Sequence, residues 1–211
     1  MMLLVGDVLR RGRPTAGVRA GGRSERVVRE VLAAAIAELA SRGYAELRIE
    51  DVAARAGVNK TTVYRRWPTK GELLAAAVYA AKPTEEMMPD TGDLRRDLIE
   101  HIKRILQWVG TDEGRAIMRL ITTERGDPHI EGLARQLRKE GLAKRVAVVE
   151  RAIARGELAP DVDGALLVEA VSAPIMSRVM RFEERVDEAT IAAFADLVVT
   201  GAEHGGAKRR R

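Results

Sequence analysis

Apolar residues recur along most of this chain at intervals of three and four positions, the spacing that collects side chains on one face of an α-helix. The first such stretch covers residues 24–42 and is followed by Gly43, which favours a helix end. Its apolar stripe consists of Val28, Val31, Leu32, Ala35, Ile36 and Leu39. The polar positions between them are expected to lie away from the core: Glu25, Arg29, Glu30 and Glu38.

The same pattern continues along the chain and predicts an all-α protein of about nine helices, because no stretch of useful length alternates as a strand does. Several predicted starts carry capping residues: Asn59, Thr69 with Glu72 three positions later, Asp127 before Pro128, and Asp187. The predicted helices cover residues 24–42, 49–56, 59–67, 69–82, 94–109, 111–126 and 127–156, a helix opening at Pro160 and Asp161, and residues 187–201.

Residues 49–70 contain two short helices joined by a tight turn, and this stretch is the most informative in the chain. Gly57 permits the left-handed backbone conformation that such a turn needs, and Asn59 can cap the helix that follows. The spacing of five apolar residues lets both helices share one small core: Val52, Ala53, Ala56, Val58 and Val63. This arrangement predicts a helix-turn-helix at about residues 46–65.

The second of these helices carries side chains suited to DNA, and no acidic residue lies between Asn59 and Lys70. Val63 and Trp67 should turn inward, which leaves hydroxyl groups, a tyrosine and cations on or near the outer face. Such groups bind phosphate oxygens and base edges. We expect base contacts from Lys60, Thr61 and Arg65. Phosphate contacts are expected from Thr62, Tyr64, Arg66 and Lys70.

A longer stretch, about residues 24–81, resembles the DNA-binding domain of TetR-family transcriptional repressors. The matching pieces are Gly43-Tyr44, Asp51-Val52-Ala53, Ala56-Gly57-Val58, Thr62-Val63-Tyr64, Trp67 and Thr69-Lys70-x-Glu72-Leu73. One departure is that Leu47 and Arg48 stand where the family usually has Thr or Ser before the first helix of the motif. That helix therefore lacks its usual side-chain cap, and Glu50 and Asp51 in its first turn can compensate in part through the helix dipole.

The resemblance implies a homodimeric repressor that releases a palindromic double-stranded operator when a small molecule binds. It implies a DNA-binding domain at residues 23–83 and an effector-binding and dimerisation domain at residues 84–202, with pairing through the last two helices. The implied effector is small and lipophilic, because the candidate lining of its cavity is apolar. Ordinary core packing would also explain each residue of that lining: Ile102, Ile105, Leu106, Trp108, Met118, Ile121, Leu137, Val171, Ile175 and Met176.

The net charge of +5 over 211 residues is concentrated in the N-terminal part. Residues 1–80 contain 14 Lys and Arg against 8 Asp and Glu, whereas the remainder is close to neutral. We interpret residues 1–22 as a flexible basic arm, in which Arg11 and Arg13 belong to an Arg-Gly-Arg-Pro sequence similar to an AT-hook. An AT-hook would lay both arginines in a minor groove. A disordered solubilising tail explains the arm equally well, and a frayed basic tail explains residues 203–211.

Few residues of this chain suit another class of function. Cysteine is absent, and the three histidines, His101, His129 and His204, do not stand at metal-ligand spacing. No Gly-rich phosphate loop or nucleophile elbow occurs, so we expect no enzyme activity, metal or cofactor. No apolar run is long enough to span a membrane, and we expect a cytoplasmic protein. The alternative is a helical ligand carrier or enzyme that borrowed the hairpin, and salt-dependent DNA affinity would separate the two.

Overall fold

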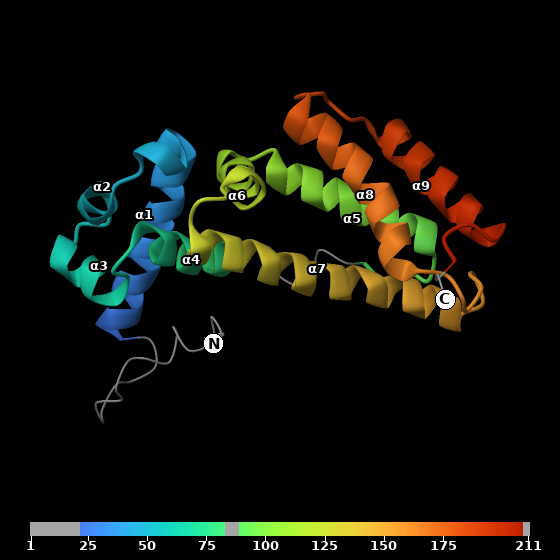
Figure 1. Cartoon of the computed structure of the whole chain (residues 1–211), viewed down its shortest axis with the longest axis horizontal. Helices are drawn as coiled ribbons and strands as arrows, with labels where there is room; N and C mark the ends of the chain where they lie inside the picture. The colour runs from blue at the N-terminus through green and yellow to red at the C-terminus, as the bar shows by residue number, and fades with distance from the viewer. Residues whose placement is uncertain (1–21, 83–88, 209–211) are drawn as a thin grey trace. The chain divides into compact units, whose positions relative to one another are not determined.

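The computed structural model describes residues 22–82 and 89–208, and within these ranges the chain forms nine α-helices and no strand (Figure 1). The helices are α1 (Arg23–Glu46), α2 (Ile49–Arg55), α3 (Lys60–Arg66), α4 (Lys70–Ala81), α5 (Leu94–Val109), α6 (Asp112–Thr123), α7 (Pro128–Ala154), α8 (Gly164–Arg181) and α9 (Glu188–Glu203). The predicted all-α fold, with a helix-turn-helix followed by a larger helical part, is confirmed.

Two compact units make up the chain. Among the described residues, the N-terminal unit comprises 22–82 and 116–134, and the C-terminal unit comprises 89–115 and 135–208. The end of α6 and the start of α7 therefore belong with the first four helices, although they lie far along the chain. The sequence suggests a single boundary near residue 83, which does not include residues 116–134 in the N-terminal unit.

The core of the N-terminal unit is built from aliphatic side chains. In this unit α1 packs against α4 and α2, and α2 packs against α3 (Figure 1). Each of these helices contributes fully enclosed side chains, among them Val31, Val52, Val63, Leu73 and Leu74. Burying one such side chain stabilises the fold by about 1.5–3 kcal/mol, so the four helices fix one another in place.

Glu38 of α1 departs from the predicted pattern. The apolar pattern predicts that this residue lies away from the core, but it is only 3% exposed. Its carboxylate forms ion pairs with Arg42, 3.0 Å away, and with Arg55 of α2, 2.6 Å away. The prediction was wrong because helical spacing does not reveal that two arginines, one from a different helix, converge on this carboxylate and make its burial tolerable.

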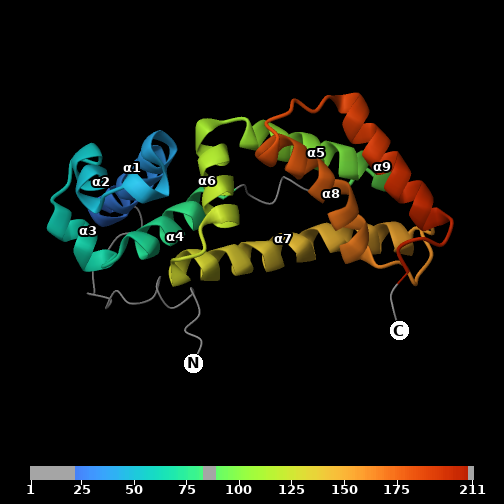
Figure 2. The same ribbon diagram turned by 45° about the horizontal axis from the view of Figure 1, so that its top comes forward.

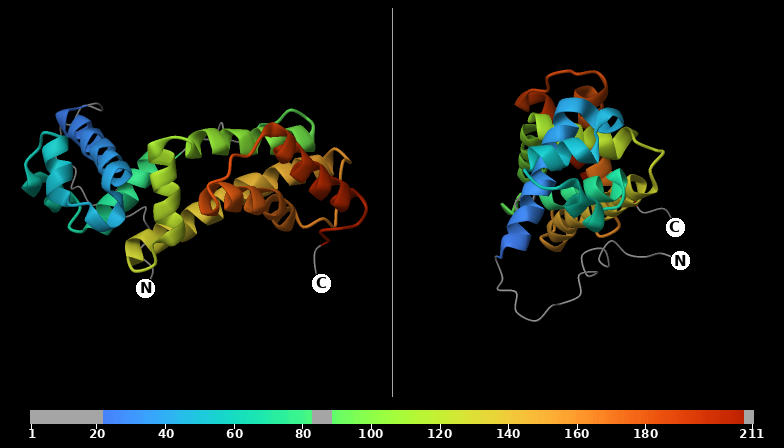
Figure 3. Two further views of the ribbon diagram at one scale, coloured as in Figure 1. Left: turned by 90° about the horizontal axis from the view of Figure 1, so that it is seen from above. Right: turned by 90° about the vertical axis from the view of Figure 1, so that its left-hand side faces the viewer.

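In the C-terminal unit, α5 lies beside α8 and α9, which also lie beside each other (Figures 2 and 3). The second half of α7 completes the core of this unit. Buried residues of this core include Leu94, Leu98, Ile102, Val148, Val149, Ala152, Leu167, Val168, Val171 and Ile175. The core is thus almost entirely aliphatic, which suits closely packed helices.

The start of α8 differs from the prediction. The helix begins at Gly164 and not at Pro160 and Asp161. Its cap is Asp163, whose carboxylate accepts two hydrogen bonds from backbone amides of the first turn. Either aspartate has the chemistry of a cap. Val162, which lies between them, is buried, and this packing holds the chain in a non-helical conformation until Asp163.

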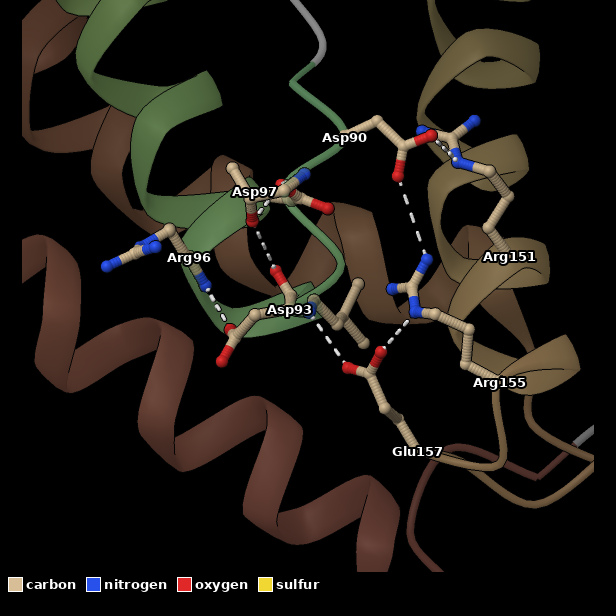
Figure 4. Close-up of polar contacts among 9 residues, drawn as sticks. Asp90, Asp93, Arg96, Asp97, Arg151, Arg155 and Glu157 are labelled. Carbon is tan, nitrogen blue, oxygen red and sulfur yellow. Dashed lines mark hydrogen bonds and ion pairs between the residues drawn. The ribbon is translucent and has the colours of Figure 1, made fainter.

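A polar cluster joins the start of α5 to the end of α7 (Figure 4). The carboxylate of Glu157 accepts a hydrogen bond from the backbone amide of Leu94 at 2.9 Å and another from Arg155 at 2.6 Å. Asp90 lies 3.0 Å from Arg151 and 3.7 Å from Arg155. Both arginines of this cluster, Arg151 near the end of α7 and Arg155 directly after it, are therefore matched by carboxylates.

None of the helices in the described ranges is both long and apolar enough to cross a membrane. Nor do the residues placed in the structure include three or more His, Cys, Asp or Glu side chains arranged to hold a metal ion. Even α7, which runs from Pro128 to Ala154, carries charged residues along its length.

Candidate nucleic-acid interface

Backbone hydrogen bonds close the turn between α2 and α3. The amide of Gly57 donates to the carbonyl of Ala54 at 3.1 Å, and the amide of Val58 donates to that of Ala53 at 3.0 Å. Gly57 has a φ of 64°, in the left-handed region that glycine adopts without steric strain. The predicted glycine turn is present, and it sets the direction in which α3 leaves α2.

Asn59 caps α3, as the sequence predicts. Its Oδ1 accepts hydrogen bonds from the backbone amide and from the hydroxyl of Thr61, both at 2.9 Å. Thr61 nevertheless remains exposed. A side-chain cap contributes about 1 kcal/mol, which matters for α3 because the helix has only seven residues.

The two faces of α3 differ in exposure. Val63 is 0% exposed and Trp67, at the C-cap, is 5% exposed, so both side chains turn inward as predicted. The outer positions Lys60, Thr61, Tyr64, Arg65 and Arg66 are exposed, and Thr62 is half-buried. The exposed face therefore carries three cations and no acidic residue of α3, a surface that attracts phosphates.

Ion pairs anchor α2 in place of a cap. Arg48, at the N-cap position, makes no capping hydrogen bond with its side chain, as its departure from the family pattern predicts. Arg55 near the C-terminal end of α2 pairs with Glu38 at 2.6 Å, and Arg42 reaches Asp51 in the first turn at 3.3 Å. The sequence does not indicate this anchor, because Glu38 lies outside the apolar stripe of α1 and its partner Arg55 is 17 positions away.

Tyr64 on α3 is bonded to Glu50 on α2. The Tyr64 hydroxyl donates to Oε1 of Glu50 at 2.9 Å. This bond raises the pKa of Tyr64, and the backbone amide of Glu50 together with the Tyr64 hydroxyl lowers the pKa of Glu50. An ionised carboxylate therefore lies beside the outer face of α3. A phosphate would have to compete with it for the Tyr64 hydroxyl.

Lys70, at the start of α4, is placed differently from the cations of α3. Its ammonium donates to the backbone carbonyl of Tyr44 at 2.7 Å and lies 4.1 Å from the centre of the Tyr44 ring. Tyr44 follows Gly43, where a φ of 74° interrupts α1 as predicted. An ammonium group has three donors, so Lys70 can still reach a phosphate, and that contact stays a prediction.

Tyr44 in turn connects α1 with the start of α7. Its hydroxyl donates to Oδ2 of Asp127 at 2.6 Å, and Oδ1 of Asp127 caps α7 by accepting from the amide of His129 at 2.8 Å. Burial raises the pKa of Tyr44, and the hydrogen bond to Asp127 adds to this effect. Burial acts to raise the pKa of Asp127 as well, but hydrogen bonds from Tyr44 and the first turn of α7 outweigh it and lower the pKa. The cap was predicted, whereas the tyrosine contact has no local signal in the sequence.

Residues 1–21 of the basic arm, which include Arg11 and Arg13, lie outside the described residues. Residues 209–211 of the basic tail lie outside them too. For both segments, contact with DNA stays a prediction.

The candidate effector residues occupy different surroundings. Ile102, Val171 and Ile175 belong to the buried core of the C-terminal unit, and Leu106 packs against it. Half-buried positions are held by Ile105, Trp108, Leu137 and Met176 of that unit, and by Met118 and Ile121 of the N-terminal unit. Whether any of them touches a ligand stays a prediction.

Two domain families match the chain in succession. Residues 31–77 match the family described as bacterial regulatory proteins, tetR family, and residues 88–198 match the tetracyclin repressor-like C-terminal domain. The HTH-type transcriptional regulator AqdR of Rhodococcus erythropolis is 32% identical over 153 residues, which cover 72% of this chain and 74% of that protein. The DNA-binding transcriptional repressor TetR of Mycobacteroides abscessus is 33% identical over 172 residues, covering 80% and 90% of the two chains.

A solved structure supports the same assignment. The TetR family transcription regulator SCO0332 aligns with a TM-score of 0.64 and 32% identity over 83% of this chain and 97% of its own. Regulators of this family bind operator DNA and small-molecule effectors, and repression by a homodimer is typical of them. The matched domains and relatives together show that this chain belongs to the TetR family of DNA-binding transcriptional regulators.

Proposed function

We propose that this protein is a homodimeric repressor that binds a palindromic operator through α3 and releases it when a small, lipophilic molecule binds. The observation that carries this proposal is the two-sided character of α3, with Val63 and Trp67 buried beneath exposed cations and hydroxyls. The major groove of DNA admits an α-helix, and a basic face on such a helix brings it there. A regulator of this kind acts on chromosomal DNA in the cytoplasm.

The side chains of α3 divide between two tasks in this proposal. Base edges are contacted by Lys60, Thr61 and Arg65, because Lys and Arg donate to guanine and Thr to several bases. Phosphates are held by Thr62, Tyr64, Arg66 and Lys70, which fixes the register of the protein without reading sequence. Arg11 and Arg13 add contacts in an adjacent minor groove.

Pairing through α8 and α9 is supported by apolar side chains at their surfaces. Leu166 of α8 is 49% exposed, Leu197 of α9 is 71% exposed, and Phe182, directly after α8, is 59% exposed. A second copy of the chain that covered these side chains would gain the free energy of their removal from water. A two-fold dimer also places two reading helices about one turn of DNA apart, which explains a palindromic operator.

Release requires that the effector bind one conformation of the dimer better than the other. We place the effector among the apolar residues of the helical part, of which Ile105, Trp108, Leu137 and Met176 are half-buried in the C-terminal unit. Such an effector binds more tightly to a dimer whose two α3 helices are further apart. It therefore shifts the protein toward that conformation, and the affinity for the operator falls.

A gel-shift titration on the operator fragment and on random duplex tests the site. Lys60→Ala should weaken operator binding by about 1–3 kcal/mol and relax specificity at one position. Tyr64→Ala should weaken binding to both DNAs alike. Lys139→Ala, which removes an exposed cation from α7, serves as the charge-matched control. Unchanged binding by both α3 variants would refute the assignment, and a wild-type affinity that does not fall with salt would favour the carrier alternative.

A further inference from the structure

Arg145 occupies a core-facing position of α7. It lies one turn before Val149 and two turns before Ala152, both 0% exposed, and residues at these spacings share one face of a helix. This face of α7 packs on the core of the C-terminal unit. Arg145 itself is half-buried, and its Nε is enclosed. Such a position is unusual for arginine, which is seldom enclosed unless it is paired.

The guanidinium of Arg145 folds back along α7 over Gly141. A Cβ atom at Gly141 would lie 3.1 Å from Nη1 and 3.9 Å from both Cζ and Nη2 of Arg145. Because glycine has no side chain, the guanidinium can occupy this position. One turn further back, Arg138 pairs with Glu169 of α8 at 3.3 Å. Glu169 and Arg138 both act electrostatically on Arg145. The three charged side chains together carry a net charge of +1.

Unlike Arg138, Arg151 and Arg155, Arg145 has no hydrogen-bond or ion-pair partner within the described part of the chain. Arg138 is matched by Glu169, and Arg151 and Arg155 are matched by the carboxylates shown in Figure 4. Arg145 forms neither a hydrogen bond nor an ion pair with any residue that the structure describes. The one nearby carboxylate, Glu169, is already paired with Arg138.

A half-buried cation whose enclosed Nε has no hydrogen-bond partner destabilises the folded state, and proteins leave few such groups unmatched. Burial lowers the pKa of Arg145, Glu169 opposes this effect and Arg138 adds to it. The guanidinium nevertheless stays protonated, because arginine does not lose its proton in proteins. An anion bound from solution would therefore be stabilised at Arg145 by a charge that no described side chain neutralises.

We propose that Arg145 binds the carboxylate of the effector, which is then a monoanionic carboxylic acid with an apolar body. The net charge of Arg138, Arg145 and Glu169 matches one carboxylate better than a doubly charged phosphate. A guanidinium also offers parallel N–H donors in the geometry that a carboxylate accepts. Leu142 and Val146 flank Arg145 on α7 and pack against the core, which supplies apolar surroundings for the rest of the molecule. This inference rests on the proposed release by a small molecule.

Matched probe pairs test the proposal on the full chain by calorimetric titration: decanoate against decanol, and 2-naphthoate against 2-naphthol. We expect at least one carboxylate to bind the wild type roughly ten- to a hundredfold more tightly than its alcohol, as for a charged hydrogen-bonded pair. Arg145→Met should abolish this preference and leave the affinity for the alcohol unchanged. Lys139→Met, an exposed cation of the same helix, is the matched control and should keep the preference.

Two further variants separate binding from a merely structural role. Arg145→Lys keeps the positive charge but lacks the parallel N–H donors of a guanidinium. Its preference for the carboxylate should therefore be reduced without being lost. Glu169→Gln removes the carboxylate that competes for Arg145, so it should bind the carboxylate probe more tightly than the wild type does. If Arg145→Met does not fold, these two variants decide the matter, because the proposal requires shifts in opposite directions.

The proposal is overturned if the wild type prefers neither carboxylate over its alcohol, or if Arg145→Met keeps the preference. It is also overturned if Arg145→Met sediments as a monomer while the wild type sediments as a dimer, since Arg145 would then meet a carboxylate of the second copy. Operator binding by the wild type without any probe is measured separately by gel shift. Failure of the proposed repressor function is therefore distinguishable from failure of the anion site.

Discussion

The hydroxyl of Tyr44 donates a hydrogen bond to Oδ2 of Asp127 across 2.6 Å, although 83 positions separate the two residues. Tyr44 stands near the end of α1, and Asp127 caps α7. Gly71, in the first turn of α4, packs against the same carboxylate. Three helices of the N-terminal unit therefore meet at Asp127, and the helices that surround the DNA-binding motif are tied to the turn between α6 and α7.

Tyr44→Phe isolates this hydrogen bond, because it removes the hydroxyl and keeps the ring. A bond to a charged acceptor contributes about 1.5–3 kcal/mol when enclosed, and both residues here are half-buried. We expect the free energy of unfolding to fall by about 1 kcal/mol in urea titrations followed by tryptophan fluorescence. Tyr79→Phe is the control, since the Tyr79 hydroxyl bonds to no described residue. Equal losses in both variants would contradict this interpretation.

Gly71→Ala tests the close approach of α4 to Asp127. A Cβ at position 71 would overlap the carboxylate of Asp127, which the Tyr44 hydroxyl and the first turn of α7 hold in place. We expect a destabilisation of about 1–3 kcal/mol, as for other cases of overpacking. Gly132→Ala on α7 is the matched control, because a Cβ there meets nothing within 4 Å. Gly132→Ala should be more stable than the wild type by up to about 1 kcal/mol, because alanine has the higher helix propensity. Thermal unfolding should therefore show a lower melting temperature for Gly71→Ala and an equal or higher one for Gly132→Ala.

Asp127 should also make stability depend on pH. Burial alone would raise its pKa, but the hydrogen bonds from Tyr44, His129 and Ile130 lower it below the usual carboxyl value. A group whose pKa is lower in the folded state contributes stability above its unfolded pKa and loses that contribution as pH falls through the folded pKa. The difference in unfolding free energy between the wild type and Asp127→Asn should therefore be complete at pH 7 and shrink below about pH 4. A difference that stays constant from pH 7 to pH 3 would show that ionisation of Asp127 contributes nothing.

Glu38→Gln tests the anchor of α2. The substitution keeps the shape of the side chain but leaves Arg42 and Arg55 without their shared carboxylate, which is buried. We expect a loss of about 2 kcal/mol in stability and weaker operator binding, because α2 supports α3. Glu30→Gln removes an exposed i,i+4 pair with Arg26 on the same helix and should change stability by less than about 0.5 kcal/mol. A Glu38→Gln variant as stable as Glu30→Gln would count against the anchor.

Features that depend on near neighbours in the chain could be predicted from the sequence. The caps at Asn59, Thr69, Asp127 and Asp187 all form as predicted. Val63 and Trp67 turn inward, as the spacing within α3 requires. A cap acts within three residues, and an apolar stripe repeats every three or four, so the local pattern contains this information.

Features that depend on distant partners could not be predicted in this way. Glu38 is buried because Arg55, 17 positions away, reaches it from another helix. Tyr44 bonds to Asp127 from a still greater separation along the chain. The half-buried position of Arg145 likewise follows from the packing of α7 on the C-terminal core and has no signature among its neighbours in the sequence.

Guanine-N7 methylation interference on an operator selected from genomic fragments tests most directly whether α3 enters the major groove, because N7 lies on the floor of that groove. We expect interference in two half-sites about one helical turn apart, and its loss at one symmetric position in the Lys60→Ala variant. A pattern that Lys60→Ala, Arg65→Ala and the wild type share unchanged, or no interference at any guanine of a tightly bound operator, would contradict the account.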